Sequence, residues 1–216
     1  MDRGVLLVHG AGRAALWRYY RQSHVPANQG TMLYQIVSFL LHIMVGLVAG
    51  MCLLRAYLQY QRISMAARAG NPLGPFLFAL TDWLVLPLRR VIPAAGRWDL
   101  ASLVGAYLLE LAMYGLLWLF AGSLGSPALV LLQAALGLLR LLLSGMTGLL
   151  IVYAVLSWMQ TDSPMVGLID RVVAPWLRPI RRLLPLVGGI DLSPLLLLVL
   201  LQVVSMVLDS FLRIPY

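Results

Sequence analysis

The sequence predicts an all-α integral membrane protein with four transmembrane helices, arranged as two parallel repeats of helix, interfacial amphipathic helix, helix. The first observation is the composition: 61% of the 216 residues are hydrophobic and only 11% are charged, whereas soluble domains average about 25% charged residues. The mean hydropathy is +0.88. The other two observations are four long apolar segments and a motif that occurs twice. Together they predict a chain that lies in a lipid bilayer.

Four apolar segments approach or exceed the ~20 residues with which a helix crosses a hydrocarbon core of ~30 Å. They cover residues 32–58, 100–120, 129–158 and 192–212. The single cysteine, Cys52, lies in the first segment, so the sequence allows no intramolecular disulfide and no cysteine-based metal cluster. We expect Cys52 to be a small packing residue.

Arginines concentrate in two of the three connections between the spans. Between the first and second spans, and between the third and fourth, lie Arg62, Arg68, Arg89, Arg90, Arg97, Arg171, Arg178, Arg181 and Arg182. Residues 123–128, a short external loop, carry no charge. The positive-inside rule therefore predicts that both arginine-bearing connections are cytoplasmic and that both ends of the four-span unit face outward. Arginine without lysine, with many Leu, Ala and Gly, indicates a GC-rich bacterial genome and hence the bacterial inner membrane.

Residues 1–31 disagree with this topology because they carry Arg3, Arg13, Arg18 and Arg21. Their apolar stretch, "GVLLVHGAG", is too short and too rich in glycine for a secretory signal peptide. We expect Met32 to be the native start and the tail to lie outside the native protein. Mass spectrometry of the native N-terminus tests this expectation.

A duplication is visible when residues 71–100 are aligned with residues 163–192 at an offset of 92 without a gap. The identical pairs are Pro72/Pro164, Pro87/Pro179, Arg89/Arg181, Arg90/Arg182, Pro93/Pro185, Gly96/Gly188, Asp99/Asp191 and Leu100/Leu192. Prolines, glycines and charges rarely match by chance in a leucine-rich chain, so the duplication predicts two repeats, 32–122 and 129–216. Each repeat has an even number of spans, which predicts that the repeats are parallel.

The core of each repeat places two arginines between two prolines, as "PLRRVIP" (87–93) and "PIRRLLP" (179–185). Pro87 and Pro179 are expected to end or kink an interfacial helix, which holds each arginine pair near the headgroups. One arginine of a pair could bind a lipid phosphate, and the other could reach Asp99 or Asp191. Two interpretations stay open. The motif either sets topology and caps the spans, or forms a cytoplasmic docking surface for a partner protein or a specific lipid.

Polar residues also occur near the middle of each span, namely His42, Glu110, Arg140 and Gln202. Such residues usually face protein, because polar groups are costly in lipid. One interpretation is a central cluster with Glu110 paired to Arg140, which could serve as a proton or cation site. The other is that they act as hydrogen-bonding glue between helices, at ~1 kcal/mol per bond.

The repeated motif resembles the YggT family (the YlmG group), small integral membrane proteins of bacteria and plastids. The resemblance covers residues 32–213 and rests on "PLRRVIP…GRWDL" and "PIRRLLP…GGIDL" in register, although "SPM" replaces "NPL" in the second copy. It implies a non-catalytic role in the assembly or organisation of membrane complexes, or in tolerance of osmotic shock. Relatives are linked to cofactor attachment to a plastid cytochrome b and to nucleoid organisation.

The sequence lacks a nucleophile and base arrangement, a phosphate-binding glycine loop and metal-ligand spacing, so we predict no enzyme activity, no metal site and no cofactor. We expect the net charge of +8 to interact with anionic lipid headgroups and not with nucleic acid, because the arginines flank apolar spans. The expected partners are membrane lipids, a partner membrane protein and a second copy of the chain. The alternative function is transport of potassium, protons or a small solute through the central polar cluster.

Overall fold

The computed structural model describes residues 29–65, 73–93, 96–120, 126–159, 164–182 and 191–212. These residues form six α-helices and no β-strand. The helices are α2 (Gln29–Tyr60), α3 (Leu73–Val91), α4 (Leu100–Phe120), α5 (Pro127–Met159), α6 (Pro164–Arg181) and α7 (Ser193–Leu212). The predictions for residues 1–28, Pro72, Pro185 and Gly188 lie outside the described residues.

Four of these helices are long and apolar enough to cross a membrane. The candidate spans are Met32–Tyr60, Leu100–Phe120, Pro127–Ser157 and Ser193–Ser210. They agree with the four predicted spans to within a few residues at each end, so the prediction of an all-α membrane protein is confirmed. The agreement is expected, since hydrophobic length is the strongest sequence signal of a membrane helix.

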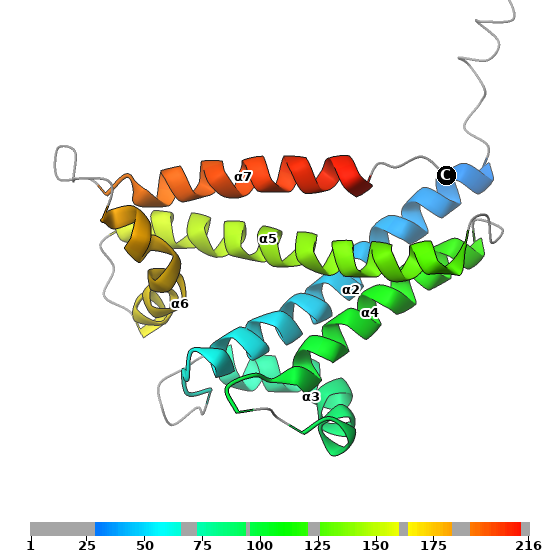
Figure 1. Ribbon diagram of the computed structural model, residues 1–216, viewed down its shortest axis with the longest axis horizontal. Coiled ribbons are helices and arrows are strands. Elements are labelled where there is room, and N and C mark those ends of the chain that lie inside the picture. The colour runs from blue at the N-terminus through cyan, green and yellow to red at the C-terminus, as the bar shows by residue number, and fades with distance from the viewer. Residues whose placement is uncertain are drawn as a thin grey trace, which may run out of the picture. The chain divides into compact units, whose positions relative to one another are not determined.

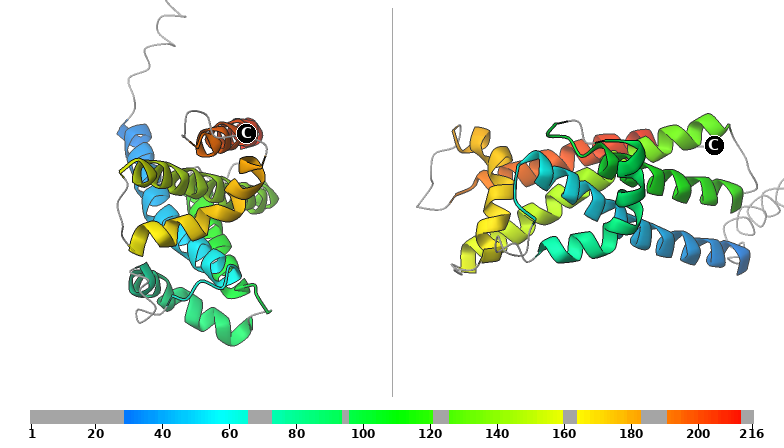
Figure 2. Two further views of the ribbon diagram at one scale, coloured as in Figure 1. Left: turned by 90° about the vertical axis from the view of Figure 1, so that its left-hand side faces the viewer. Right: turned by 90° about the horizontal axis from the view of Figure 1, so that it is seen from below.

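The chain divides into two compact units, Met1–Leu40 and Leu41–Tyr216. In the first unit the described residues are the first turns of α2. In the second unit α5 packs against α4, α6 and α7, and α3 packs against α4. Figure 1 shows α3 beside the beginning of α4, and α6 beside the end of α5 and the beginning of α7, as the turned views of Figure 2 also show. The order of span, short helix, span thus occurs twice, while the parallel symmetry of the repeats stays a prediction.

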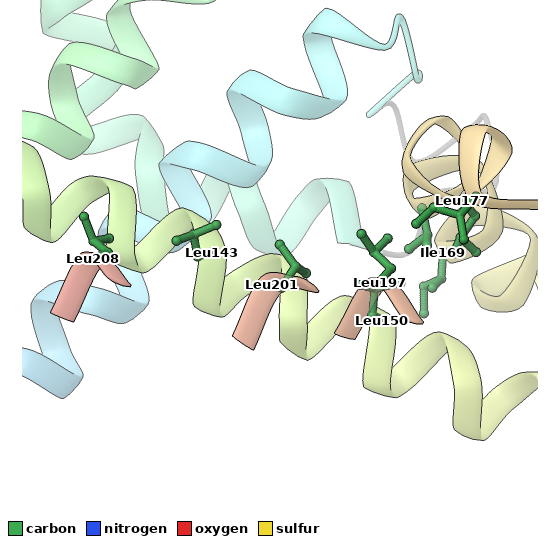
Figure 3. Packing of buried hydrophobic residues seen from close by; sticks show 9 residues of the cluster. Leu143, Leu150, Ile169, Leu177, Leu197, Leu201 and Leu208 are labelled. Carbon is green, nitrogen blue, oxygen red and sulfur yellow. The ribbon is translucent and has the colours of Figure 1, made fainter. Parts of the chain in front are cut away.

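The larger apolar core belongs to the second copy of this unit. Leucines of α5 and α7 face one another along both helices, and Ile169 and Leu177 of α6 close one end (Figure 3). The core of the first copy consists of smaller side chains, among them Ala49, Cys52 and Ala106. Cys52 is fully buried there, as expected for a packing residue.

The two short helices are both amphipathic, but their outer faces differ. On α6 the buried face includes Ile169, Val172 and Leu177. The outer face carries Arg171, Arg178 and Arg182, the last of these just after the helix end. On α3 the outer face is apolar, with Phe76 52%, Trp83 61% and Leu86 51% exposed. The outer face of α6 is therefore basic, whereas that of α3 is apolar.

The sequence predicts that Pro87 and Pro179 end or kink their helices, and of these two outcomes the helix end does not occur. Pro87 lies inside α3, which continues to Val91, and Pro179 lies inside α6, which continues to Arg181. A proline removes one backbone hydrogen bond, to the carbonyl four residues earlier. The residues that bear those carbonyls, Trp83 and Pro175, are exposed, so each carbonyl lies on the open side of its helix. The arginine pairs consequently lie in or directly after the last helical turn.

Candidate functional site

In the first copy, the first arginine of the pair joins three helices. Arg89 Nη2 donates to Asp99 Oδ2 at 2.6 Å and to Gln59 Oε1 of α2 at 3.0 Å. Asp99 directly precedes α4, and its Oδ1 accepts from the backbone N–H of Ser102 at 3.3 Å. Asp99 therefore caps α4 and binds Arg89 at the same time, so both roles considered for it from the sequence are present.

The second copy repeats this arrangement with a different partner on the first span. Arg181 Nε donates to Asp191 Oδ2 at 2.8 Å, and Arg181 Nη2 donates to the Tyr153 hydroxyl of α5 at 2.7 Å. Asp191 Oδ1 accepts from the Ser193 backbone N–H at 2.9 Å, at the start of α7. We call each set an arginine clamp: Arg89, Asp99 and Gln59 in the first copy, and Arg181, Asp191 and Tyr153 in the second. Each clamp ties a short helix to both spans of its copy.

A buried arginine extends the first clamp. Arg55 of α2 is 2% exposed, and its Nη1 donates to Asp82 Oδ1 at 2.6 Å and to Thr81 Oγ1 at 2.7 Å. Its Nε lies 3.9 Å from Asp99 Oδ2. Arg55 corresponds to Tyr153 when "RAYLQY" (55–60) is aligned with "YAVLSW" (153–158), so only the first copy has this second cation. Arg55 is not among the site residues predicted from the sequence, although its charge inside the predicted span 32–58 is a signal for it.

The electrostatics of the clamps keep both aspartates ionised. Burial alone would raise the pKa of Asp99, but hydrogen bonds from Ser102 and Arg89, with the charge of Arg89, hold that pKa below the ordinary value. Burial likewise opposes ionisation of Asp191, while contacts from Ser193 and Arg181 lower its pKa overall. The pKa of Arg181 is correspondingly raised despite its partial burial, chiefly through Asp191 and Tyr153. Both clamps are therefore ion pairs over the physiological pH range.

The second arginine of each pair takes no part in the clamp. Arg90 and Arg182 are exposed, as are Arg171 and Arg178. None of these four forms an ion pair with a carboxylate of the described residues. We call Arg171, Arg178 and Arg182 the basic face of α6. These side chains recur at helical spacing, and none of them is neutralised by a carboxylate of the described residues.

The single intramembrane cluster, one of the two interpretations of the four mid-span polar residues, does not form. Arg140 Nε lies 3.3 Å from Asp209 Oδ1 of α7, so Arg140 pairs with Asp209 and not with Glu110. Glu110 is buried on α4 and interacts electrostatically with His42, whose ring meets Tyr114 edge to face at 6.1 Å between centroids. Gln202 is exposed on α7. The rotation of α5 against α7 decides these pairings, and a helical register alone does not fix that rotation.

A cavity of about 750 Å³ is lined mainly by α2 and α5. Most of its lining side chains are apolar, and none of His42, Glu110, Arg140 and Gln202 lines it. Within the described part of the chain, no group of three or more His, Cys, Asp or Glu residues is placed to hold a metal ion.

Comparison with known proteins agrees with the repeated motif. The family model described as CCB3/YggT matches residues 34–120 and 132–212. The protein named YggT from Escherichia coli K12 is 37% identical over 174 residues, which cover 79% of this chain and 87% of that protein. A protein from the proC 3' region of Vibrio alginolyticus is 36% identical over 171 residues, covering 77% of this chain and 89% of that protein. No solved structure matches the chain.

Proposed function

Since the chain belongs to the CCB3/YggT family, we propose that it is a non-catalytic inner-membrane protein that supports the assembly or organisation of membrane complexes, or tolerance of osmotic stress. The observation that carries this proposal is that only the first arginine of each pair takes part in a clamp. Arg89 and Arg181 bind carboxylates in the clamps, while Arg90 and Arg182 bind no carboxylate of the described residues. A motif needed only to hold the fold would require one arginine per copy.

The basic face of α6 is the best candidate for the docking surface itself. Arg171, Arg178 and Arg182 are exposed on a helix whose opposite face is buried against α5 and α7. Three arginines on a firmly packed helix suit an acidic cytoplasmic segment of another membrane protein, because planar guanidinium groups bind carboxylates in pairs of hydrogen bonds. Charges of this kind set partner choice and association rate more than affinity.

The proposal includes the orientation of the protein. Both short helices and both arginine pairs face the cytoplasm, and the ends of the four-span unit face outward, because arginine is retained on the cytoplasmic side. Alkaline phosphatase fused after Tyr216 should be active in a bacterial host, while the same enzyme inserted after Arg182 should be inactive. The reverse pattern would contradict this orientation and place the basic face outside the cell.

Site-specific photocrosslinking tests the docking role. Gly167 is exposed on α6 and a Cβ added there meets nothing within 4 Å, so p-benzoylphenylalanine can be placed there without removing an arginine. We expect a crosslinked adduct with a membrane protein that disappears in an Arg171→Ser/Arg178→Ser/Arg182→Ser variant. The corresponding triple lysine variant keeps the charge but loses the paired hydrogen bonds, so its adduct should be weakened and still present. The same probe at Leu195, 62% exposed on α7, is the control and should give no such adduct. An adduct at Gly167 whose yield is unchanged in the triple serine variant would contradict the docking role.

Flux measurements separate this proposal from transport. The alternative function needs a wet path lined by the intramembrane polar residues, whereas Arg140 pairs with Asp209 and Gln202 is exposed away from the apolar cavity. We expect wild-type proteoliposomes to show no potassium or proton flux above protein-free vesicles. Flux that Glu110→Gln abolishes, and that the triple serine variant of α6 leaves unchanged, would overturn the proposal in favour of transport.

A further inference from the structure

The cavity lined by α2 and α5 has the size and lining of a binding site. Its volume of about 750 Å³ falls within the ~300–1,000 Å³ of typical ligand pockets. Small residues form much of its wall, including Gly46 and Gly50 on α2 and Ser144 and Gly145 on α5. A Cβ added at Gly50 or Gly145 would meet nothing within 4 Å. A Cβ at Gly46 would lie 3.8 Å from Leu141 Cδ1 of α5, so the two helices are in contact there, and the open space lies beside Gly50 and Gly145.

The two ends of the cavity differ in chemistry. Its lining runs along α2 from Gly46 to Tyr60, about 21 Å at ~1.5 Å per residue, which exceeds the depth of one leaflet in a ~30 Å core. The end at Tyr60 is also lined by Tyr57, Trp98 and Trp176, whereas the deep end is aliphatic. Tyrosine and tryptophan prefer the headgroup level. The cavity thus has the profile of a lipid molecule, with an apolar interior and an amphipathic mouth.

A cation without a carboxylate partner lies at this mouth. The Arg97 guanidinium is 4.8 Å above the Tyr60 ring, and Arg97 Nη2 donates to the Tyr60 carbonyl at 3.2 Å. The Trp98 ring lies 4.7 Å from the Tyr60 ring. Arg97 is exposed and pairs with no carboxylate of the described residues. Gly96, with φ of 61°, supplies the turn that precedes Arg97 and Trp98, a conformation that favours glycine.

We propose that this cavity holds an acyl chain of an anionic phospholipid from the leaflet that adjoins α3 and α6, with the lipid phosphate on Arg97. A guanidinium presents a planar set of donors that matches phosphate, and its positive charge at the mouth selects an anionic headgroup over a zwitterionic one. The headgroup contact belongs to the first copy alone, because Gly189 and Ile190 occupy the positions aligned with Arg97 and Trp98. It requires no protein partner, so it is independent of the docking role of α6.

The lipid would also join the two copies of the motif. Tyr57 of α2 donates to the Val172 carbonyl of α6 at 2.8 Å and accepts from Trp176 Nε1 at 2.7 Å. These bonds link the copies at the mouth, and from there to Gly46 the cavity lies between α2 and α5. An acyl chain fills the part of the boundary that the protein side chains leave open, and dispersion contacts with the chain replace those missing contacts.

Photolabelling with lipid tests the proposal on the full chain. The probe is phosphatidylglycerol with a diazirine near the end of one acyl chain, in phosphatidylcholine vesicles, and the matched arm uses phosphatidylcholine with the same diazirine. We expect the label on α2 around Gly46 and Gly50 and on α5 around Ser144 and Gly145. The phosphatidylglycerol probe should label these segments about fivefold more strongly, since one interfacial arginine contributes ~1 kcal/mol.

Two variants separate the acyl-chain part from the headgroup part. Gly50→Leu/Gly145→Leu fills the cavity and should remove most of the label from both probes. Its control is Gly115→Leu/Gly148→Leu, at two glycines where a Cβ also meets nothing within 4 Å but which do not line the cavity. Arg97→Gln should lower phosphatidylglycerol labelling to the level of phosphatidylcholine and leave phosphatidylcholine labelling unchanged.

Three results would overturn the proposal. Equal labelling of the cavity-filling variant and its control would mean that no chain occupies the cavity. Equal labelling of the wild type by the two probes would mean that the site does not select an anionic headgroup. A Gly50→Cys/Cys52→Ala chain that oxidises to a disulfide-linked dimer in phosphatidylglycerol vesicles would assign the cavity to a second copy.

Discussion

Arg89 Nη2 lies 2.6 Å from Asp99 Oδ2, and Asp99 follows Arg89 by ten positions, as Asp191 follows Arg181. The side chain of Asp99 is fully buried, whereas that of Asp191 is 30% exposed. Asp99 also has Arg55 within 3.9 Å. The same pair of residues is therefore present twice, once inside the protein and once at its surface.

This difference predicts unequal costs for the same substitution. Asp99→Asn should lower the free energy of unfolding by ~3 kcal/mol, because it leaves the buried Arg55 with one charge partner fewer. Asp191→Asn should lower it by at most ~1 kcal/mol, since the exposed pair is screened by water. Each asparagine keeps the shape of the capping residue, so each serves as the other's control. The check is denaturant unfolding in one detergent; equal losses would contradict the burial of the first clamp.

The lowered pKa values of Asp99 and Asp191 predict the direction of the pH dependence. A carboxyl whose pKa is lower in the folded state stabilises the fold fully above its unfolded pKa of ~3.9 and loses that contribution as pH falls through the folded value. The thermal midpoint should therefore be flat from about pH 8 to about pH 5 and fall below about pH 4. The Asp99→Asn variant should start lower and fall less. A wild-type midpoint that rises on acidification would contradict the ion pairs.

How far the sequence predicts this site depends on whether a residue belongs to the repeat. The contact between Arg89 and Asp99 is predictable because its spacing recurs in the second copy with the same residue types. A role for Arg55 is harder to predict, because the residue aligned with it in the second copy is Tyr153. A comparison of the two repeats therefore does not single out Arg55. The pairing of Arg140 with Asp209 depends on how α5 and α7 rotate against each other, which side-chain packing decides. Local motifs therefore carry over from sequence to structure, and pairings between spans do not.

The end of α2 predicts a stabilising substitution. Arg62 has φ of 57°, and the Arg62 and Ile63 N–H groups donate to the carbonyls of Gln59 and Leu58 at 3.0 and 2.9 Å. This is the Schellman arrangement, in which glycine is the usual residue at the left-handed position. Arg62→Gly should raise the free energy of unfolding by up to ~1 kcal/mol, since the left-handed conformation costs other residues ~1–2 kcal/mol. Arg62→Ala, which keeps a Cβ, is the control and should give no gain in denaturant unfolding.

The close approach of α4 and α5 predicts that a substitution at Gly137 destabilises the protein. A Cβ on Gly137 of α5 would lie 2.7 Å from Tyr114 Cε2 and 2.9 Å from Glu110 Oε2. Glu110 is only 4% exposed, so its carboxyl has little room to move. Gly137→Ala should therefore lower the free energy of unfolding by ~1–3 kcal/mol, the usual cost of overpacking. The measurement is denaturant unfolding in detergent.

The control for this prediction is Gly115→Ala on α4, where a Cβ meets nothing within 4 Å. That change should be neutral or stabilising, because alanine in a helix interior is favoured over glycine by ~1 kcal/mol. A second variant, Gly137→Ala/Tyr114→Ala, should lose less than the sum of its single changes, since the clash with the ring disappears. Strict additivity of the two losses, or equal stability of Gly137→Ala and Gly115→Ala, would mean that α4 and α5 lie further apart at Gly137 than these contacts require.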